Sequence, residues 1–134
     1  MLETYVIARD KFLKPDGRMF PTRADLCIQP FTEQAIFDER VNGAEWWNQK
    51  KYYGLDISVL HEKAVAEKFE QPILDSLDPK NLLSERPYRK QYNFEKCTVE
   101  DLKHVKMEFT HIMQKTALLH GYVMYFDAFF DGSD

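Results

Sequence analysis

Four histidines are the side chains of this sequence that could bind a metal ion or act as a general base: His61, His104, His111 and His120. Two histidines that hold one metal from a strand usually lie close together on the same face, and His104 and His111 are farther apart than that. A histidine in an apolar segment, such as His120, is more often a hydrogen-bonded core residue. The histidines are therefore expected to be structural rather than metal-binding or catalytic.

Three carboxylates near the end of the chain offer a different chemistry, either an acid–base pair or a calcium site. They are Asp127, Asp131 and Asp134. Their spacing lacks the glycine and the closing glutamate of a calcium-binding loop. We therefore expect these aspartates to lie in a solvated turn or at an edge exposed by the end of the chain.

The segment between Asn42 and Ile57 carries both tryptophans of the chain and two adjacent tyrosines among polar residues, without a clean period. Trp and Tyr give a large contact area at a small cost in side-chain entropy, and they are common anchors of protein interfaces. This pattern favours an insertion that docks on another protein surface. The alternative is a loop whose aromatic side chains fold back onto their own core.

The composition bounds the class of protein. The 134 residues are 44% hydrophobic and 30% charged, which is typical of one globular domain. The formal net charge of -4, with both signs interspersed, provides no basic surface for nucleic acid or an anionic membrane. No apolar run approaches the ~20 residues that span a bilayer, and no secretory signal is recognisable. We expect an intracellular protein in which Cys27 and Cys97 are free, buried thiols.

Two elements are predicted before residue 31. Apolar residues at helical spacing predict a helix at the start of the chain, which Pro15 and Gly17 end. From residue 18 onward the period changes to two, and the residues from Ala24 to Ile28 alternate between apolar and polar. This alternation predicts a half-buried strand that Pro30 interrupts.

Helical elements are predicted on both sides of the aromatic segment. Residues 33–41 and 61–69 have helix-compatible patterns. Asp78 directly before Pro79 combines an N-cap residue with proline at the first helical position, which predicts a short helical turn.

The last third of the chain favours strands. Residues 92–94 and 105–110 alternate, and residues 118–130 are almost continuously apolar. Between the first two segments, Thr98 and Asp101 have the spacing of a capping box that would open one helical turn. Short turns between alternating strands predict an antiparallel sheet or barrel, with the last strand at its centre or packed under another domain.

Several short motifs, taken in order, resemble the protein arginine methyltransferases over essentially the whole chain. They are Asp10-Lys11-Phe12-Leu13-Lys14-Pro15-Asp16-Gly17, Arg18-Met19-Phe20-Pro21, Trp46-Trp47, Tyr53-Gly54-Leu55-Asp56-Ile57, Leu77-Asp78-Pro79-Lys80, His120-Gly121 and Tyr125-Phe126-Asp127. In that family a domain that binds S-adenosylmethionine precedes a β-barrel that covers the substrate groove. A helical arm inserted in the barrel embraces a second subunit.

The resemblance implies that this chain is the later portion of such a protein. Residues 1–14 would be the linking helix and residues 15–134 a mainly β, antiparallel barrel-like domain, with the dimerisation arm inserted at about residues 33–60. The arm residues that would bury against the second subunit are Trp46, Trp47, Tyr52, Tyr53, Leu55 and Ile57. Met1 would lie at the edge of the active site, because it would follow closely the second of two glutamates that the family carries in a preceding hairpin.

The resemblance also implies the activity of the parent protein, which would be an S-adenosylmethionine-dependent protein arginine methyltransferase. A guanidinium is recognised by paired carboxylates in a fork geometry, and neither those glutamates nor a glycine-rich cofactor motif is found in this chain. We therefore expect the fragment alone to be inactive, with no catalytic residue, bound cofactor or metal.

The expected partners follow from the same resemblance. The parent would form a homodimer and act on arginine-containing proteins such as histones or Gly-Arg-rich tails in the cytoplasm, the nucleus or both. One alternative is a regulatory paralogue that has lost the chemistry and only dimerises with an active relative. Another is an unrelated all-β interaction module, which would be monomeric and would bury Trp46 and Trp47 in its own core.

Overall fold

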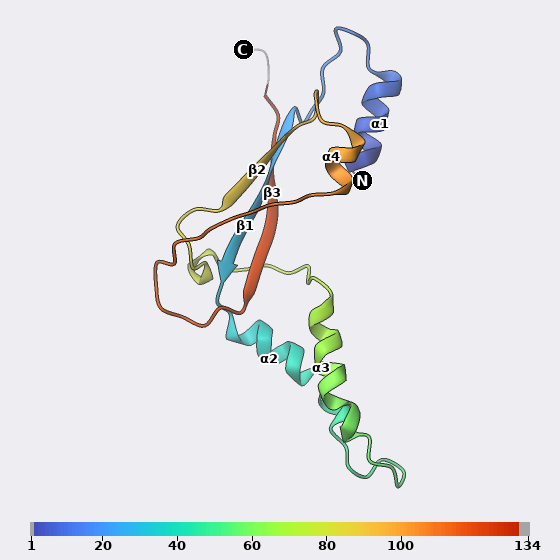
Figure 1. Ribbon diagram of the computed structural model, residues 1–134, viewed down its shortest axis with the longest axis vertical. Coiled ribbons are helices and arrows are strands. Elements are labelled where there is room, and N and C mark those ends of the chain that lie inside the picture. The colour runs from blue at the N-terminus through green and yellow to red at the C-terminus, as the bar shows by residue number, and fades with distance from the viewer. Residues whose placement is uncertain (1, 132–134) are drawn as a thin grey trace. The chain divides into compact units, whose positions relative to one another are not determined.

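The computed structural model describes residues 2–131 of the chain (Figure 1). They belong to two compact units: Met1–Pro30, Leu83–Thr116 and Tyr122–Asp134 form the first, and Phe31–Leu82 and Ala117–Gly121 the second. The elements in chain order, with η marking single 3-10 turns, are α1 (Leu2–Phe12), β1 (Arg23–Phe31), α2 (Gln34–Asn42), η1 (Glu45–Trp47), η2 (Ser58–Leu60), α3 (His61–Glu70), η3 (Pro79–Asn81), β2 (Tyr88–Asn93), α4 (Val99–Lys103) and β3 (Gly121–Phe129).

The sheet has three strands in the order β2-β1-β3. Strands β1 and β2 are antiparallel, with a register from Arg23 opposite Asn93 to Ile28 opposite Tyr88. Strand β3 also runs antiparallel to β1, because the amide of Thr22 before β1 donates to the carbonyl of Phe129 at the end of β3 (2.9 Å). The prediction of an antiparallel sheet with helices is confirmed. Within the described residues this sheet is open, so the closed barrel remains a proposal.

Strand β1 is buried on both faces, so the prediction of a half-buried strand was wrong. Ala24 and Ile28 are buried on one face, and Asp25, Cys27 and Gln29 are buried on the other. The alternation of residue types is real, but β1 is the central strand and has a neighbour along each edge. Its polar residues are covered by side chains of β2 and β3, whereas the period of the sequence indicates only which face is more polar.

Pro30 lies within β1 and does not interrupt it. Its carbonyl accepts a hydrogen bond from the amide of Leu83 (2.9 Å). Proline removes only a donor, so it is tolerated in a strand where its missing N–H has no partner to satisfy.

The core of the first unit lies where α1 and α4 meet the sheet. Its buried residues are Val6, Met19, Ala24, Tyr92, Phe94 and Cys97. Tyr5 packs edge-to-face on Phe94, with ring centroids 5.2 Å apart. Arg9 donates to the carbonyls of Phe94 (2.7 Å) and Cys97 (2.8 Å), which connects α1 to the turn after β2. Cys27 and Cys97 are free and buried, as predicted.

The predicted helix signals are confirmed at several ends. Helix α1 stops at Phe12, shortly before Pro15 and Gly17. The capping box of α4 is formed in both directions, because Asp101 N donates to Thr98 Oγ1 (3.3 Å) and Thr98 N donates to Asp101 Oδ2 (2.8 Å). The Asp78 carboxylate accepts from the amide of Lys80 (3.0 Å) and caps η3.

Two strand predictions were wrong. Residues 105–110 form no strand, although Phe109 packs against the rings of Tyr88 and Tyr122 at 6.0 and 5.5 Å. Figure 1 shows this segment as coil between α4 and β3. Alternation lets one set of side chains contact the sheet, but a strand also requires a neighbour for its backbone groups. The last strand was expected either at the centre of the sheet or packed under another domain. Strand β3 is an edge strand of the three, so the first of these alternatives is wrong.

The second unit is built on two helices. Phe37 of α2 and Phe69 of α3 have ring centroids 5.4 Å apart. The chain between these helices contains η1, a short hairpin and η2. No helix among residues 2–131 has the length and apolar character required to cross a membrane.

Candidate functional site

Four aromatic side chains between α2 and α3 form one continuous cluster, which we call the aromatic cluster: Trp46, Trp47, Tyr52 and Tyr53. The rings of Trp46 and Trp47 are 4.8 Å apart, Trp46 and Tyr52 are 5.3 Å apart, and Tyr52 and Tyr53 are 4.8 Å apart. All three pairs have edge-on geometry, which brings the partial positive edge of one ring to the negative face of the next. The four rings therefore support one another.

Local backbone bonds hold the tryptophans in place. Helix α2 ends where the amides of Gly43 and Ala44 bond back to carbonyls of its last turn, and η1 follows at once. The Gln49 side chain donates to the carbonyl of Trp46 (2.7 Å). The Ile57 amide donates to the carbonyl of Gln49 (3.0 Å), which closes the segment between η1 and η2.

The tyrosines lie on a two-residue hairpin. Tyr52 and Leu55 exchange backbone hydrogen bonds in both directions, at 2.8 and 2.9 Å. The two residues of the turn both have positive φ, 49° at Tyr53 and 84° at Gly54. Such turns usually have Asn or Gly at the first position, because a bulky side chain is strained in the left-handed region. Tyr53 is nevertheless 91% exposed, with its ring edge-on to that of Tyr52, so burial does not explain its presence.

The cluster faces solvent rather than the interior. Trp46 is 52% exposed and Trp47 is 38% exposed, while Tyr52 and Ile57 are half-buried. The alternative that both tryptophans lie in the core of an interaction module is therefore wrong. Leu55 on the same hairpin is also exposed. A contiguous exposed apolar surface of this kind is typical of a protein interaction site.

The Tyr53→Asn substitution separates conformational strain from surface contact. Asparagine adopts the left-handed region more readily than tyrosine, so the free energy of unfolding should stay equal or rise by up to about 1 kcal/mol. If the cluster is an interface, the same substitution should weaken association by about tenfold. Urea unfolding and sedimentation of the same sample measure the two effects. A stable variant that assembles like the wild type would exclude Tyr53 from the interface.

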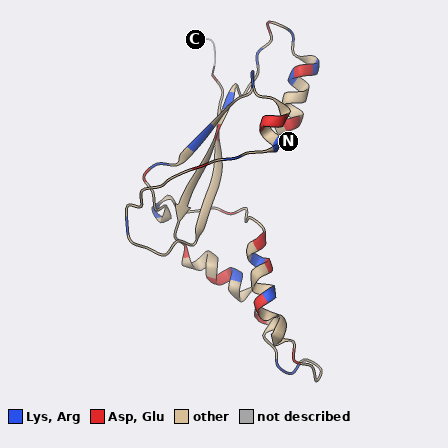
Figure 2. Ribbon diagram, in the orientation of Figure 1, with Lys and Arg blue, Asp and Glu red and all other residues tan. Residues whose placement is uncertain are grey.

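The two helices beside the cluster each carry both acidic and basic residues. Figure 2 shows both signs on α2 and on α3. The aromatic cluster therefore has a mixed electrostatic setting with no single-sign surface, in agreement with the absence of a basic footprint in the sequence.

The histidines do not come together as a metal site. Among residues 2–131 no group of three or more His, Cys, Asp and Glu side chains could hold a metal ion. His61 lies 3.5 Å from Glu45, and His120 makes hydrogen bonds to residues 32–34. His104 and His111 were expected on a strand, and they lie instead at the end of α4 and in coil.

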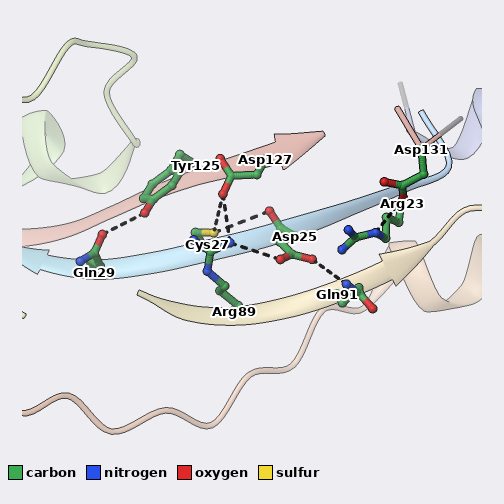
Figure 3. Close-up of polar contacts among 9 residues, drawn as sticks. All are labelled: Arg23, Asp25, Cys27, Gln29, Arg89, Gln91, Tyr125, Asp127 and Asp131. Carbon is green, nitrogen blue, oxygen red and sulfur yellow. Dashed lines mark hydrogen bonds and ion pairs between the residues drawn. The ribbon is translucent and has the colours of Figure 1, made fainter. Parts of the chain in front are cut away.

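Sequence reasoning missed a polar cluster on the sheet, which Figure 3 shows. Only the polar side of β1, which contributes part of the cluster, was recognised from the sequence. Arg89 lies between two carboxylates, 3.3 Å from Asp25 and 3.2 Å from Asp127. Gln91 donates to the buried carboxylate of Asp25 (3.1 Å). These contacts connect side chains of all three strands. The signal that could have found them is opposite charge on the polar faces of neighbouring strands.

The expectation of a solvated turn was wrong for Asp127, whereas Asp131 is exposed and lies just after the end of β3. Asp127 belongs to β3 and pairs with Arg89, and Asp131 accepts hydrogen bonds from Arg23 (2.9 Å) and Thr22 (3.0 Å). These two contacts lower the pKa of the Asp131 carboxyl. Strand pairing brings these residues together across a large distance in sequence. Asp134 and Met1 lie outside the described residues.

Burial raises the pKa of the Cys27 thiol, and Asp127 and Asp25 add to this effect while Arg89 opposes it. An acid with a raised folded-state pKa favours folding below its unfolded pKa, and this contribution is lost as pH rises through the folded value. Wild-type stability should therefore fall above about pH 9. We expect the stability difference between wild type and Cys27→Ala to shrink there, as urea unfolding at several pH values would measure. A constant difference would show that the Cys27 thiol has the same pKa in the folded and the unfolded chain, which would contradict the prediction.

The comparisons with known proteins all point to one family. The sequence model described as the arginine methyltransferase oligomerization subdomain matches residues 22–134. The chain is 38% identical over 133 residues to the probable histone-arginine methyltransferase 1.3 of Arabidopsis thaliana, covering 99% of this chain and 25% of that protein. It is 39% identical over 135 residues to the probable histone-arginine methyltransferase CARMER of Drosophila melanogaster, with the same coverage. The chain thus spans about a quarter of the length of these curated relatives.

Solved structures support the fold. The Trypanosoma brucei PRMT1 enzyme-prozyme heterotetrameric complex with AdoHcy matches with a TM-score of 0.59 and 25% identity, over 78% of this chain and 30% of that chain. The Arabidopsis thaliana protein arginine methyltransferase 10 matches with a TM-score of 0.55 and 23% identity, over 76% of this chain and 33% of that chain, which shows the fold alone. The sequence match, the relatives and the fold agree, and the chain belongs to the family of the arginine methyltransferase oligomerization subdomain.

Proposed function

We propose that the aromatic cluster, with Leu55 and Ile57, is the surface through which this chain holds two subunits together. The observation that carries this proposal is a strained, exposed aromatic hairpin in a chain of the oligomerization subdomain family. A side chain kept in the left-handed region although it is 91% exposed points to a functional constraint. The second subunit is an identical copy, so the assembly is a homodimer. The arm that carries the surface is about residues 33–60.

The activity proposed for the intact protein is S-adenosylmethionine-dependent methylation of protein arginines. The relatives whose matches cover 99% of this chain are named histone-arginine methyltransferases. These names support the proposed activity and a nuclear role. Its substrates are arginine-containing proteins such as histones or Gly-Arg-rich tails. We propose that the protein acts in the nucleus, the cytoplasm or both.

The sheet is proposed to be one wall of the substrate groove, within a β-barrel domain of residues 15–134 that follows the linking helix of residues 1–14. Strand β3 supports this proposal, because it is an edge strand whose alternate residues Tyr122, Met124 and Phe126 are exposed. Apolar side chains on an edge strand of this kind are usually covered by further structure. Met1, which the resemblance places at the active-site edge, is part of the same proposal.

The segment itself is proposed to be non-catalytic and to bind no cofactor. A nucleotide-like cofactor is usually held by a glycine-rich turn at the start of a helix. Of the five glycines in the chain, the four described ones lie apart at Gly17, Gly43, Gly54 and Gly121, and none opens a helix. The described residues therefore do not fit S-adenosylmethionine, and no catalytic step is assigned to them.

A second candidate function is that of a regulatory subunit without activity of its own. The complex from Trypanosoma brucei pairs an enzyme with a prozyme, so the matched fold occurs in an assembly of that kind. The names of the curated relatives favour the enzyme.

The test is a methylation assay of the intact protein with labelled S-adenosylmethionine and an arginine-rich peptide, together with its mass in solution. A dimeric protein that labels the peptide supports the enzyme, and the 134-residue chain alone should give no label. A dimeric protein that gives no label alone but stimulates an active relative supports the regulatory subunit instead.

A further inference from the structure

His120 connects the segment that leads into β3 with the N-terminal end of α2. Its Nδ1 lies 3.1 Å from the amide of Glu33, which donates to it, and 3.2 Å from Thr32 Oγ1. Its Nε2 lies 3.1 Å from Gln34 Oε1. The ring also packs against Phe37 at 5.7 Å. One imidazole therefore contacts the residue before the N-cap of α2, the N-cap residue itself and its first turn.

These contacts select one protonation state of the ring. A backbone N–H can only donate, so Nδ1 must present its lone pair to Glu33. The ring proton then lies on Nε2 and is donated to Gln34 Oε1. The Gln34 amide is consistent with this assignment, because its Nε2 donates to Asp38 Oδ1 (2.8 Å). The imidazolium form would place a second N–H directly against the Glu33 amide.

The charged groups around the ring do not replace the lost bond. The Glu33 carboxylate accepts a hydrogen bond from Asn81, and Asp38 reaches the ring only through Gln34. Lys80, within η3, interacts electrostatically with Glu33. The two carboxylates attract a positive imidazole, but neither can accept the proton that protonation adds at Nδ1 in this geometry.

We propose that His120 is a pH-sensitive clasp, which fixes the N-terminal end of α2 while its imidazole is neutral and releases it when Nδ1 is protonated. Histidine is the side chain whose charge ordinarily changes between pH 5 and 8. Helix α2 leads directly into the aromatic cluster, so the clasp controls the element that carries this surface. The inference concerns the attachment of α2 and does not depend on what the cluster binds.

The test is hydrogen exchange of the Glu33 amide in this chain, measured by NMR at about pH 7.5 and about pH 5 and divided by the intrinsic exchange rate at each pH. Loss of the acceptor for a partly buried amide should lower its protection about tenfold at the lower pH. Protection that is unchanged between the two pH values would overturn the proposal.

Two substitutions separate the clasp from a purely structural role. In His120→Asn the side-chain oxygen takes the place of Nδ1 and cannot be protonated, so protection should persist and lose its pH dependence. In His120→Ala protection should be low at both pH values. His104→Ala, at the end of α4, is the matched control and should keep the wild-type response. If the Asn variant loses the same protection of the Glu33 amide at low pH, a group other than His120 is responsible, and the proposal is wrong.

A second readout remains useful if a variant folds poorly. The ¹⁵N shifts of the His120 ring in the wild-type chain distinguish a proton on Nε2 from one on Nδ1. Near neutral pH we expect the proton on Nε2 alone. A ring with its proton on Nδ1 would overturn the proposal independently of any substitution.

Discussion

Replacing Trp46 and Trp47 together with alanine is expected to convert the intact protein from a dimer to monomers. Both side chains are partly exposed in the single chain, and their rings contact each other edge-on within the aromatic cluster. Central tryptophans of an interface commonly contribute about 2 kcal/mol or more each, so the association constant should fall about a thousandfold or more. Sedimentation over a range of protein concentrations measures this change, and arginine methylation should fall with the loss of assembly.

The matched control is Phe12→Ala, which removes another exposed aromatic side chain, 80% exposed on α1. This variant should assemble and methylate like the wild type. Because Trp47 lies beside Leu60 and Ala64, thermal unfolding must show that the double variant keeps its fold. A folded double variant that remains a dimer would contradict the proposed surface, whatever its activity.

The Phe94→Ala substitution is expected to lower the free energy of unfolding of the first unit by about 3 to 5 kcal/mol. Phe94 is 1% exposed and lies among the buried residues of the core, with Tyr5 edge-on against its ring. Removing the ring deletes its packing against Tyr5 of α1 and leaves a cavity. The hydrogen bonds from the Arg9 guanidinium to the carbonyls of Phe94 and Cys97 do not require the ring, so the fold should persist with lower stability.

Urea unfolding of this chain measures the effect, with Phe126→Ala as the control. Phe126 is 71% exposed on β3, so its truncation should change the free energy of unfolding by less than about 0.5 kcal/mol. Equal losses in the two variants would show that Phe94 is not the centre of this core.

Helix positions were predictable because their signals are local. The stop after α1, the capping box of α4 and the cap of η3 depend on residues within a few positions of one another. The aromatic segment was also identified as a candidate interface from composition alone. The sequence left open whether its rings face solvent, and the exposure of Trp46 and Tyr53 answers that question.

The sheet was less predictable because a strand is defined by its neighbours. Residues 105–110 alternate as well as β1 does, yet only β1 has paired strands on both sides. The same limitation applies to Asp127, which has no partner nearby in sequence and finds Arg89 through β3 and β2. His120 likewise meets the start of α2 only in the folded chain.

The sequence by itself determined the family resemblance, the helix boundaries, the free thiols and the location of the aromatic segment. Only the tertiary structure decided which strand is central, which charged residues pair, how Tyr53 is presented and what His120 contacts. The physical reason is the range of the interactions. Caps and helical periods are satisfied within one or two turns of chain, whereas strand pairing and side-chain contacts join residues that only folding brings together.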